Sequence, residues 1–245
     1  MKRKTLALVG IAMTVIIVFS VAATATVLIP SMAKVEEKTE SPTLDKQAPP
    51  DLQKVVFIHY KKDKGSGRGG DGKGPKAPKC YDFIGKNVRW KNAENYYVSS
   101  ALDKDVIDDS VNTWNSETSS SIFGSSSVGE HTWGEYDNIN SITLGTYGDP
   151  KVIAVTAVWW NPRSKAIVEY DIKFVERWGW GNGADNLMDL QNIATHEFGH
   201  AAGLDDIYKD ACSEVTMYGY SDYGETKKRD LEEADITGIQ ELYGA

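Results

Sequence analysis

Basic residues are scarce in the last two thirds of this 245-residue chain. Residues 81–245 carry 13 Lys or Arg against 28 Asp or Glu, a net charge of −15, whereas residues 1–80 carry 14 against 7. Binding to nucleic acid needs a basic face that neutralises phosphates. We therefore expect no nucleic-acid partner, and we expect most of these charges to lie on a solvated surface.

Cysteine is nearly absent, because Cys80 and Cys212 are the only two. One pair in an oxidising compartment predicts one disulfide. It would close a loop of about 130 residues and contribute ~4 kcal/mol in the chain-entropy model. Two free thiols are the alternative that the sequence leaves open.

Charge is also missing from Thr5 to Ile29, directly after Lys2, Arg3 and Lys4. The basic start and the small residues near the end of this run favour a cleavable signal peptide over residues 1–29. The run is longer than ~20 residues, so an uncleaved membrane anchor is the alternative. In both cases we expect a secreted or extracellular protein, whose N-terminal segment contacts the membrane if it is retained.

Residues 30–79 lack the composition of a folded core. Residues 30–54 contain four prolines, and residues 61–79 are rich in Gly and Lys. These features predict a flexible linker or pro-segment over residues 30–79. The short apolar run 55–60 is compatible with a strand. The folded domain is expected over residues 80–245.

The rest of the chain mixes strand and helix patterns. Strands are predicted at 95–100, 141–145, 152–160 and 166–175, and a loop at 119–138. Helices are predicted at 102–118, 187–203 and 232–244, the second of them with Asp185 or Asn186 as its N-cap. Strands first and helices late favour the α+β class.

Histidine is rare as well, with four in the chain, and two of them lie in "ATHEFGHAAGLDDIY", residues 194–208. On a helix, His196 and His200 lie one turn apart, ~6 Å along the axis, and point the same way. Their imidazoles can bind one metal ion. Glu197 lies about 100° around the helix from His196, which suits a base acting on a metal-bound water.

A third ligand is predicted after the helix. Gly203 lets the chain leave the helix through a left-handed turn, and a residue three positions later can swing back to the metal. That residue is Asp206, with Asp205 as the competing carboxylate. Three protein ligands leave the fourth zinc position open, as a catalytic site requires.

The pattern H-E-x-x-H-x-x-G-x-x-D, followed by Met217 in "EVTMYGY", resembles the metzincin signature. Features from about Trp90 to Gly244 are most similar to matrixins, among them "VRWKNAENYYVSS", "VIAVTAVWW" and "ADITGIQELYG". The resemblance implies a metzincin fold: a twisted, mostly parallel five-stranded sheet with an active-site helix and a C-terminal helix. It also implies a zinc-dependent endopeptidase.

The same resemblance implies roles for further residues. Met217 would pack beneath the zinc, and Asp235 would support the turn that carries it. Tyr218 and Tyr220 would line the substrate pocket, with ordinary core packing as the alternative. Residues 152–160 would be the edge strand that pairs with an extended substrate, with an interior strand as the alternative.

The sequence also departs from matrixins. Asp206 stands where matrixins have His, which predicts a weaker Lewis acid. The histidines of a second, structural zinc are not visible, and His131 is expected to be a loop or core residue. No EF-hand-like run is present, so calcium is undetermined. Cys80 precedes the domain where matrixins carry a zinc-binding Cys, but it lacks the full switch motif.

We therefore expect an exported zinc endopeptidase that cleaves polypeptides as a monomer, through a zinc-bound water activated by Glu197. Two alternatives remain. One is a non-catalytic cell-surface binding protein on a metzincin scaffold. The other is a zinc amidase that acts on cell-wall peptides.

Overall fold

Most strands form one large sheet in the computed structural model, which describes residues 48–62 and 78–245. Its seven strands have the spatial order β3-β2-β4-β6-β5-β1-β9. Their bounds are Gln53–Lys61 (β1), Glu94–Val98 (β2), Phe123–Val128 (β3), Asn140–Gly145 (β4), Val152–Asn161 (β5), Ala166–Val175 (β6) and Tyr220–Ser221 (β9). Trp180–Gly181 (β7) and Met188–Asp189 (β8) form a separate parallel pair.

The α+β class and the mostly parallel sheet are confirmed. β5 runs antiparallel to its neighbours β6 and β1, and all other neighbouring strands are parallel. The four strands predicted at 95–100, 141–145, 152–160 and 166–175 correspond to β2, β4, β5 and β6, and the sheet also contains β1, β3 and β9. β5 is almost completely buried, as is usual for a strand covered on both faces and paired on both sides.

The folded domain does not begin at Cys80, as expected, because β1 precedes this residue and belongs to the sheet. Residues 53–61 do not belong to a linker, because they form a full strand of the sheet and pair with β5 over its length. The described residues all fall within one compact unit, Pro42–Ala245. In the sequence, the Gly- and Lys-rich stretch after residue 61 separates this apolar run from the rest of the domain, so the run alone does not indicate a strand of the sheet.

The loop expected at 119–138 is also wrong in part, because residues 123–128 form β3. Three serines in "FGSSSV" give little strand signal. β3 is the outermost strand on its side of the sheet and pairs only with β2 among the described strands. A strand at that position has one edge in solvent, and small polar side chains are tolerated there.

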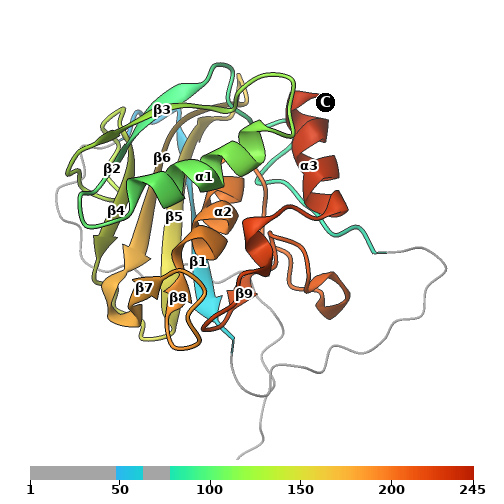
Figure 1. Cartoon of the computed structure of the whole chain (residues 1–245). Coiled ribbons are helices and arrows are strands. Elements are labelled where there is room, and N and C mark those ends of the chain that lie inside the picture. The colour runs from blue at the N-terminus through green and yellow to red at the C-terminus, as the bar shows by residue number, and fades with distance from the viewer. Residues whose placement is uncertain (1–47, 63–77) are drawn as a thin grey trace, which may run out of the picture. The chain divides into compact units, whose positions relative to one another are not determined.

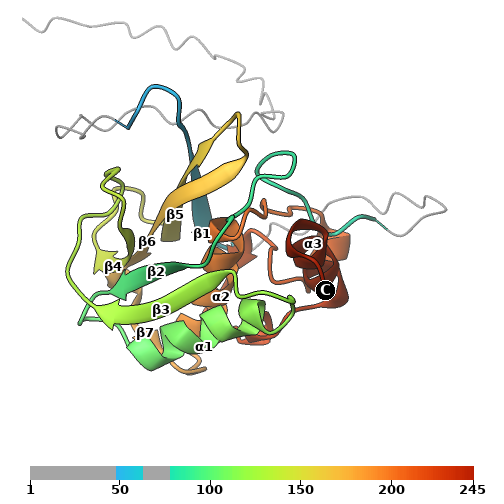
Figure 2. The same cartoon turned by 90° about the horizontal axis from the view of Figure 1, so that it is seen from above.

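Three helices pack with the sheet: Lys104–Asn115 (α1), Leu190–Ala201 (α2) and Glu233–Tyr243 (α3). α1 and α2 lie side by side over one face of the sheet, with α3 beyond them (Figure 1; Figure 2). Short 3-10 turns occupy Glu176–Trp178, Asp210–Cys212 and Lys227–Arg229. All three helices were expected.

The start of α2 differs from the prediction. Its N-cap is Asp189, whose side chain accepts the N–H of Asn192 at 2.8 Å, instead of Asp185 or Asn186. The residues before it form β8, so the helix begins at Leu190. Arg229 also pairs with Asp189, which places a buried cap and an ion pair at the same carboxylate.

α2 is the buried axis of the domain. Every one of its residues except Gln191 is buried. On one side Phe198 packs edge-to-face against the rings of Tyr96, Phe123 and Tyr170. On another side Trp114 of α1 donates from Nε1 to the carbonyl oxygen of Thr195 at 2.7 Å. These contacts fix the helix that carries the two histidines of the motif.

Within residues 48–62 and 78–245, no helix is long and apolar enough to cross a membrane. The predicted signal peptide or anchor, residues 1–29, lies outside the described residues. Residues 30–47 and 63–77 of the predicted linker also lie outside them.

Candidate metal centre

Two histidines face each other on consecutive turns of α2. The Nε2 atoms of His196 and His200 lie 3.1 Å apart. Both side chains are almost completely buried, as is Glu197 between them. This is the geometry that the i, i+4 spacing predicted.

The hydrogen bonds of these histidines define which nitrogen carries the proton. Nδ1 of His196 lies 2.7 Å from the carbonyl oxygen of Thr216, and Nδ1 of His200 lies 3.0 Å from that of Leu204. A carbonyl oxygen only accepts, so each Nδ1 is the donor. Each Nε2 therefore presents a lone pair, and the two lone pairs point at the same place.

Asp206 supplies a third atom at this place. Its Oδ1 lies 3.3 Å from Nε2 of His196 and 3.5 Å from Nε2 of His200. This oxygen is buried and makes no hydrogen bond of acceptable geometry. Its partner oxygen, Oδ2, accepts from the hydroxyl of Tyr208 at 3.0 Å.

The chain reaches this position through Gly203. The φ angle of this glycine is 107°, a conformation that other residues rarely adopt. A Cβ atom there would also lie 2.6 Å from the carbonyl oxygen of Val88. The glycine turn thus ends the helix and returns the chain to the two histidines.

These three atoms fit a metal ion. Two imidazole Nε2 atoms and one carboxylate oxygen lie within 3.5 Å of one another, while each Nδ1 is bonded elsewhere, an arrangement that a bound cation satisfies. Two imidazoles and a carboxylate are typical zinc ligands, and three protein ligands leave an open position. Asp205 does not converge with them: its Oδ1 accepts the N–H of Asp206 instead.

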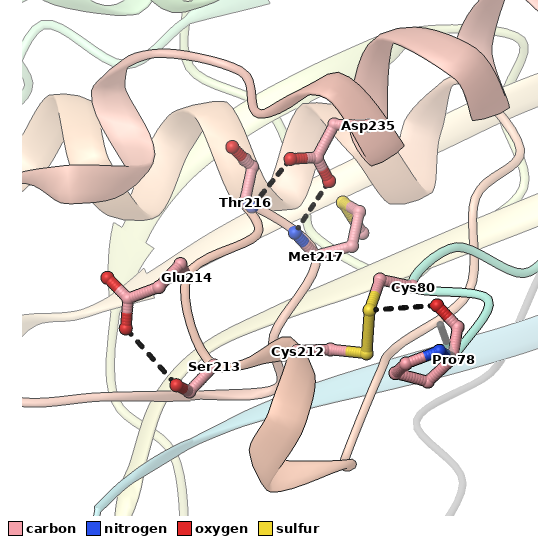
Figure 3. The surroundings of a disulfide bond; sticks show 8 residues. All are labelled: Pro78, Cys80, Cys212, Ser213, Glu214, Thr216, Met217 and Asp235. Atoms are coloured by element: carbon pink, nitrogen blue, oxygen red, sulfur yellow. Dashed lines mark hydrogen bonds between the residues drawn. A yellow bond between two sulfur atoms is a disulfide. The ribbon is translucent and has the colours of Figure 1, made fainter. Parts of the chain in front are cut away.

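Met217 lies directly below the helix. Its side chain is fully buried, and its Sδ would lie only 2.2 Å from a Cβ atom at Gly199. Asp235 accepts the N–H of Thr216 at 2.8 Å and that of Met217 at 3.2 Å (Figure 3). The carbonyl oxygen of Thr216, in the same turn, accepts from Nδ1 of His196. By holding this turn, Asp235 therefore also helps to orient His196.

Glu197 has a distinct environment beside the ligands. Its Oε2 accepts from the Thr156 hydroxyl at 2.6 Å, and its Oε1 lies 3.0 Å from Nδ1 of His59. Burial raises the pKa of Glu197 to about 7. A carboxylate with this pKa can take up and release a proton near neutral pH.

The sequence did not identify the part that β1 plays in this site. Phe57 stacks on His200, with ring centroids 3.9 Å apart and planes 5° apart. The ring of His59 lies 4.0 Å from that of His196. The apolar run around His59 is the sequence feature that could have indicated this role. Strand alternation places Phe57 and His59 on one face, and a His in such a run is expected to face the interior.

The edge strand expected at residues 152–160 is not an edge in this structure. β5 pairs on one side with β6 and on the other with β1. The prediction fails because the backbone of β1 pairs with β5 along the side that β6 does not cover. The interior alternative therefore describes the strand as it stands here.

Tyr218 and Tyr220 follow Met217 and lie beside each other, with ring centroids 5.8 Å apart. The Tyr218 ring is buried, and its hydroxyl lies 3.4 Å from Asp210. Tyr220 belongs to β9, which pairs with the end of β1. Both tyrosines therefore lie at the segment that flanks β1, and their role with substrate stays a prediction.

Cys80 and Cys212 form a disulfide (Figure 3). It joins the segment just after residue 77 to the 3-10 turn Asp210–Cys212. The predicted disulfide is confirmed, and the two alternatives for these cysteines, a zinc-binding Cys80 and free thiols, do not hold in this structure.

Groups of side chains that could share a metal ion all lie around α2 in the part of the chain that the structure describes. Two groups of His and acidic side chains lie close enough to share an ion: His196, His200 and Asp206, and the overlapping set of His59, His196 and Glu197. His131 belongs to neither group, and its ring contacts Tyr97 at 4.6 Å.

The chain is similar in sequence to known proteins. The sequence model of the matrixin family matches residues 86–244, more than half of the chain. Matrix metalloproteinase-9 of Canis lupus familiaris is 43% identical over 65 residues. That match covers 26% of this chain and only 8% of the relative, so the chain spans a small part of that protein.

Proposed function

The chain belongs to the matrixin family, and on this premise we propose that it is an exported, zinc-dependent endopeptidase that hydrolyses peptide bonds in polypeptides. The observation that carries the proposal is the convergence of two Nε2 lone pairs and the unpartnered Oδ1 of Asp206, with Glu197 beside them on the same helix. The uncharged N-terminal run and the disulfide support export to an oxidising compartment.

His196, His200 and Asp206 would hold the zinc ion. When bound, the zinc supplies a Lewis acid that polarises the scissile carbonyl and makes water more acidic. Glu197 takes the proton of the attacking water and later delivers it to the leaving amine. Thr156 fixes one carboxylate oxygen of Glu197 by donating to it, so the other oxygen is the one that handles the proton.

A protease assay on unfolded protein substrates tests this function. It compares the zinc-loaded full chain, the same protein after chelation, and Glu197→Gln, which keeps the size of the side chain but cannot act as a base. Because Phe57 and His59 cover the site, each arm is repeated in a Phe57→Ala/His59→Ala background. We expect hydrolysis only with zinc and Glu197 together.

Zinc content and thermal unfolding are measured on every sample to show that the proteins are loaded and folded. If the loaded, folded protein hydrolyses no substrate in either background, the non-catalytic binding protein becomes the better account. Cleavage of cell-wall peptides but not of unfolded proteins would favour the amidase.

A further inference from the structure

β1 lies along the metal centre in the position where a polypeptide would bind. Gln53 to Tyr60 pair antiparallel with β5 from Trp160 to Val152. Addition of a strand to a sheet edge is a common mode of peptide recognition, with affinity from main-chain hydrogen bonds and selectivity from alternate side chains. Here that edge is already filled by the protein's own chain (Figure 2).

The side chains of β1 that face inward cover both histidine ligands. Successive residues of a strand point to opposite faces. Phe57 stacks on His200 and His59 lies against His196, so these two side chains of β1 cover the rings of both histidines. As a result the histidines and Glu197 are no more than 1% exposed. A substrate carbonyl has no path to the metal while β1 is in place.

His59 also engages the proposed base. Its Nδ1 lies 3.0 Å from Oε1 of Glu197, the oxygen that Thr156 leaves available. Its other nitrogen, Nε2, lies 3.1 Å from Oγ of Ser221, which also contacts the buried Lys228 at 2.9 Å. The His59 side chain thus bridges Glu197 of α2 and Ser221 of β9 and engages the carboxylate oxygen that would take a proton from water.

β1 is an addition to the family domain. It precedes residues 86–244, the region that the matrixin model matches. The five strands expected of that domain are complete without it. The disulfide secures the chain at Cys80, after β1, so departure of β1 would leave the start of the matched domain attached to Cys212.

We propose that residues 53–61 are an inhibitory strand that occupies the substrate groove and keeps the enzyme latent until the strand is displaced or removed. The proposal rests on the proposed endopeptidase function. In it, β1 occupies the groove, and Phe57 and His59 block the site. A permanent structural strand is the competing explanation.

Full-chain variants test the proposal. Phe57→Ala/His59→Ala removes the two side chains that cover the metal centre. Val56→Ala is the matched control, because Val56 lies on the same strand with its side chain on the opposite face. We expect the double variant to cleave a fluorogenic peptide at least about tenfold faster than wild type, a change that corresponds to ~1.4 kcal/mol. Val56→Ala should match wild type.

A second readout does not depend on catalysis. Binding of a peptide hydroxamate, which combines a zinc ligand with a strand-forming peptide, is measured by calorimetry on the zinc-loaded proteins. We expect at least about tenfold tighter binding to the double variant than to wild type. A synthetic peptide of residues 53–61 should compete with the hydroxamate and restore inhibition. If the double variant does not fold, His59→Ala alone is used in the same assays.

The outcomes separate the two proposals. Equal hydroxamate affinity and equal cleavage in wild type and the double variant would overturn the inhibitory strand and leave the endopeptidase standing. Tighter hydroxamate binding without cleavage in any variant would support the strand and reject the endopeptidase. Zinc content of every variant is measured to show that the site is loaded.

Discussion

The hydroxyl of Tyr208 donates to Oδ2 of Asp206 at 3.0 Å and thereby leaves Oδ1 turned toward the two histidines. Asp206 is the atypical member of the proposed ligand set, since matrixins have His there. A carboxylate can rotate between its two oxygens, so a second hydrogen bond fixes which one faces the metal. Tyr208 is therefore a positioning residue for the third ligand.

Removing this hydroxyl should weaken metal binding. We expect Tyr208→Phe to lower zinc affinity about 10- to 100-fold, the usual cost of losing a partner that orients a ligand. The measurement is competition with a chelator of known affinity. Tyr223→Phe is the control, because the Tyr223 ring is exposed and packs on Trp178. Equal affinities in the two variants would show that Asp206 needs no such support.

Gly199 is the residue of α2 that packs on the methionine turn. A Cβ atom there would lie 2.2 Å from Sδ of Met217 and 2.9 Å from the Trp114 ring. Gly→Ala in a helix normally stabilises by up to ~1 kcal/mol. Here we expect Gly199→Ala to destabilise by about 1–3 kcal/mol through overpacking, measured by urea unfolding.

Gly145 provides the matched control for that experiment. A Cβ atom at this position would meet only the end of the Lys173 side chain, at 3.9 Å. Gly145→Ala should therefore leave the free energy of unfolding within about 0.5 kcal/mol of wild type. If Gly199→Ala is equally neutral, the contact between α2 and Met217 is looser than described.

Two buried carboxylates of β6 should make stability depend on pH. Burial raises the pKa of Glu169 to about 8 and that of Asp171 to about 7, although backbone N–H groups of the loop at residues 134–138 donate to both. In each case the folded pKa lies above the unfolded value, so the folded state binds more protons. The stabilisation is complete below about pH 4 and is lost as pH rises toward 8.

Urea unfolding at pH 5 and at pH 8 checks this expectation. The free energy of unfolding should be lower at pH 8, and Glu169→Gln, which mimics the protonated acid, should reduce the difference. Glu135→Gln is the control, because Glu135 belongs to the same loop region and its side chain is only partly buried. Stability that rises from pH 5 to pH 8 would contradict the assignment.

The disulfide should contribute strongly to stability because it spans 132 residues. Restricting the unfolded chain over such a loop is worth about 3–5 kcal/mol in the chain-entropy model. We expect Cys80→Ser/Cys212→Ser to lose stability of that order in urea. A variant as stable as wild type would mean that the linkage constrains little of the unfolded ensemble.

Much of the metal centre could be predicted from the sequence, because its geometry is local. His196, Glu197 and His200 belong to one helix, and Gly203 and Asp206 follow within a single turn. Helical spacing and the left-handed turn at Gly203 fix their relative positions without any information about the rest of the chain.

The long-range parts could not be predicted in the same way. β1 reaches β5 across about 100 residues, and no local pattern indicates which strand will pair with which. The serines of β3 give little strand signal in the sequence, although pairing with β2 orders them as a strand. No local pattern indicates a role for His59 either, because its partners Glu197 and Ser221 lie more than 130 residues away in the chain.

The central claim is that His196, His200 and Asp206 bind one zinc ion beside Glu197. The most direct test is anomalous diffraction at the zinc absorption edge from crystals of the zinc-loaded full chain. The account predicts one strong peak, about 2.0–2.2 Å from Nε2 of both histidines and from an Asp206 carboxylate oxygen. A structure with zinc elsewhere, or with Asp206 turned away from the ion, would contradict it.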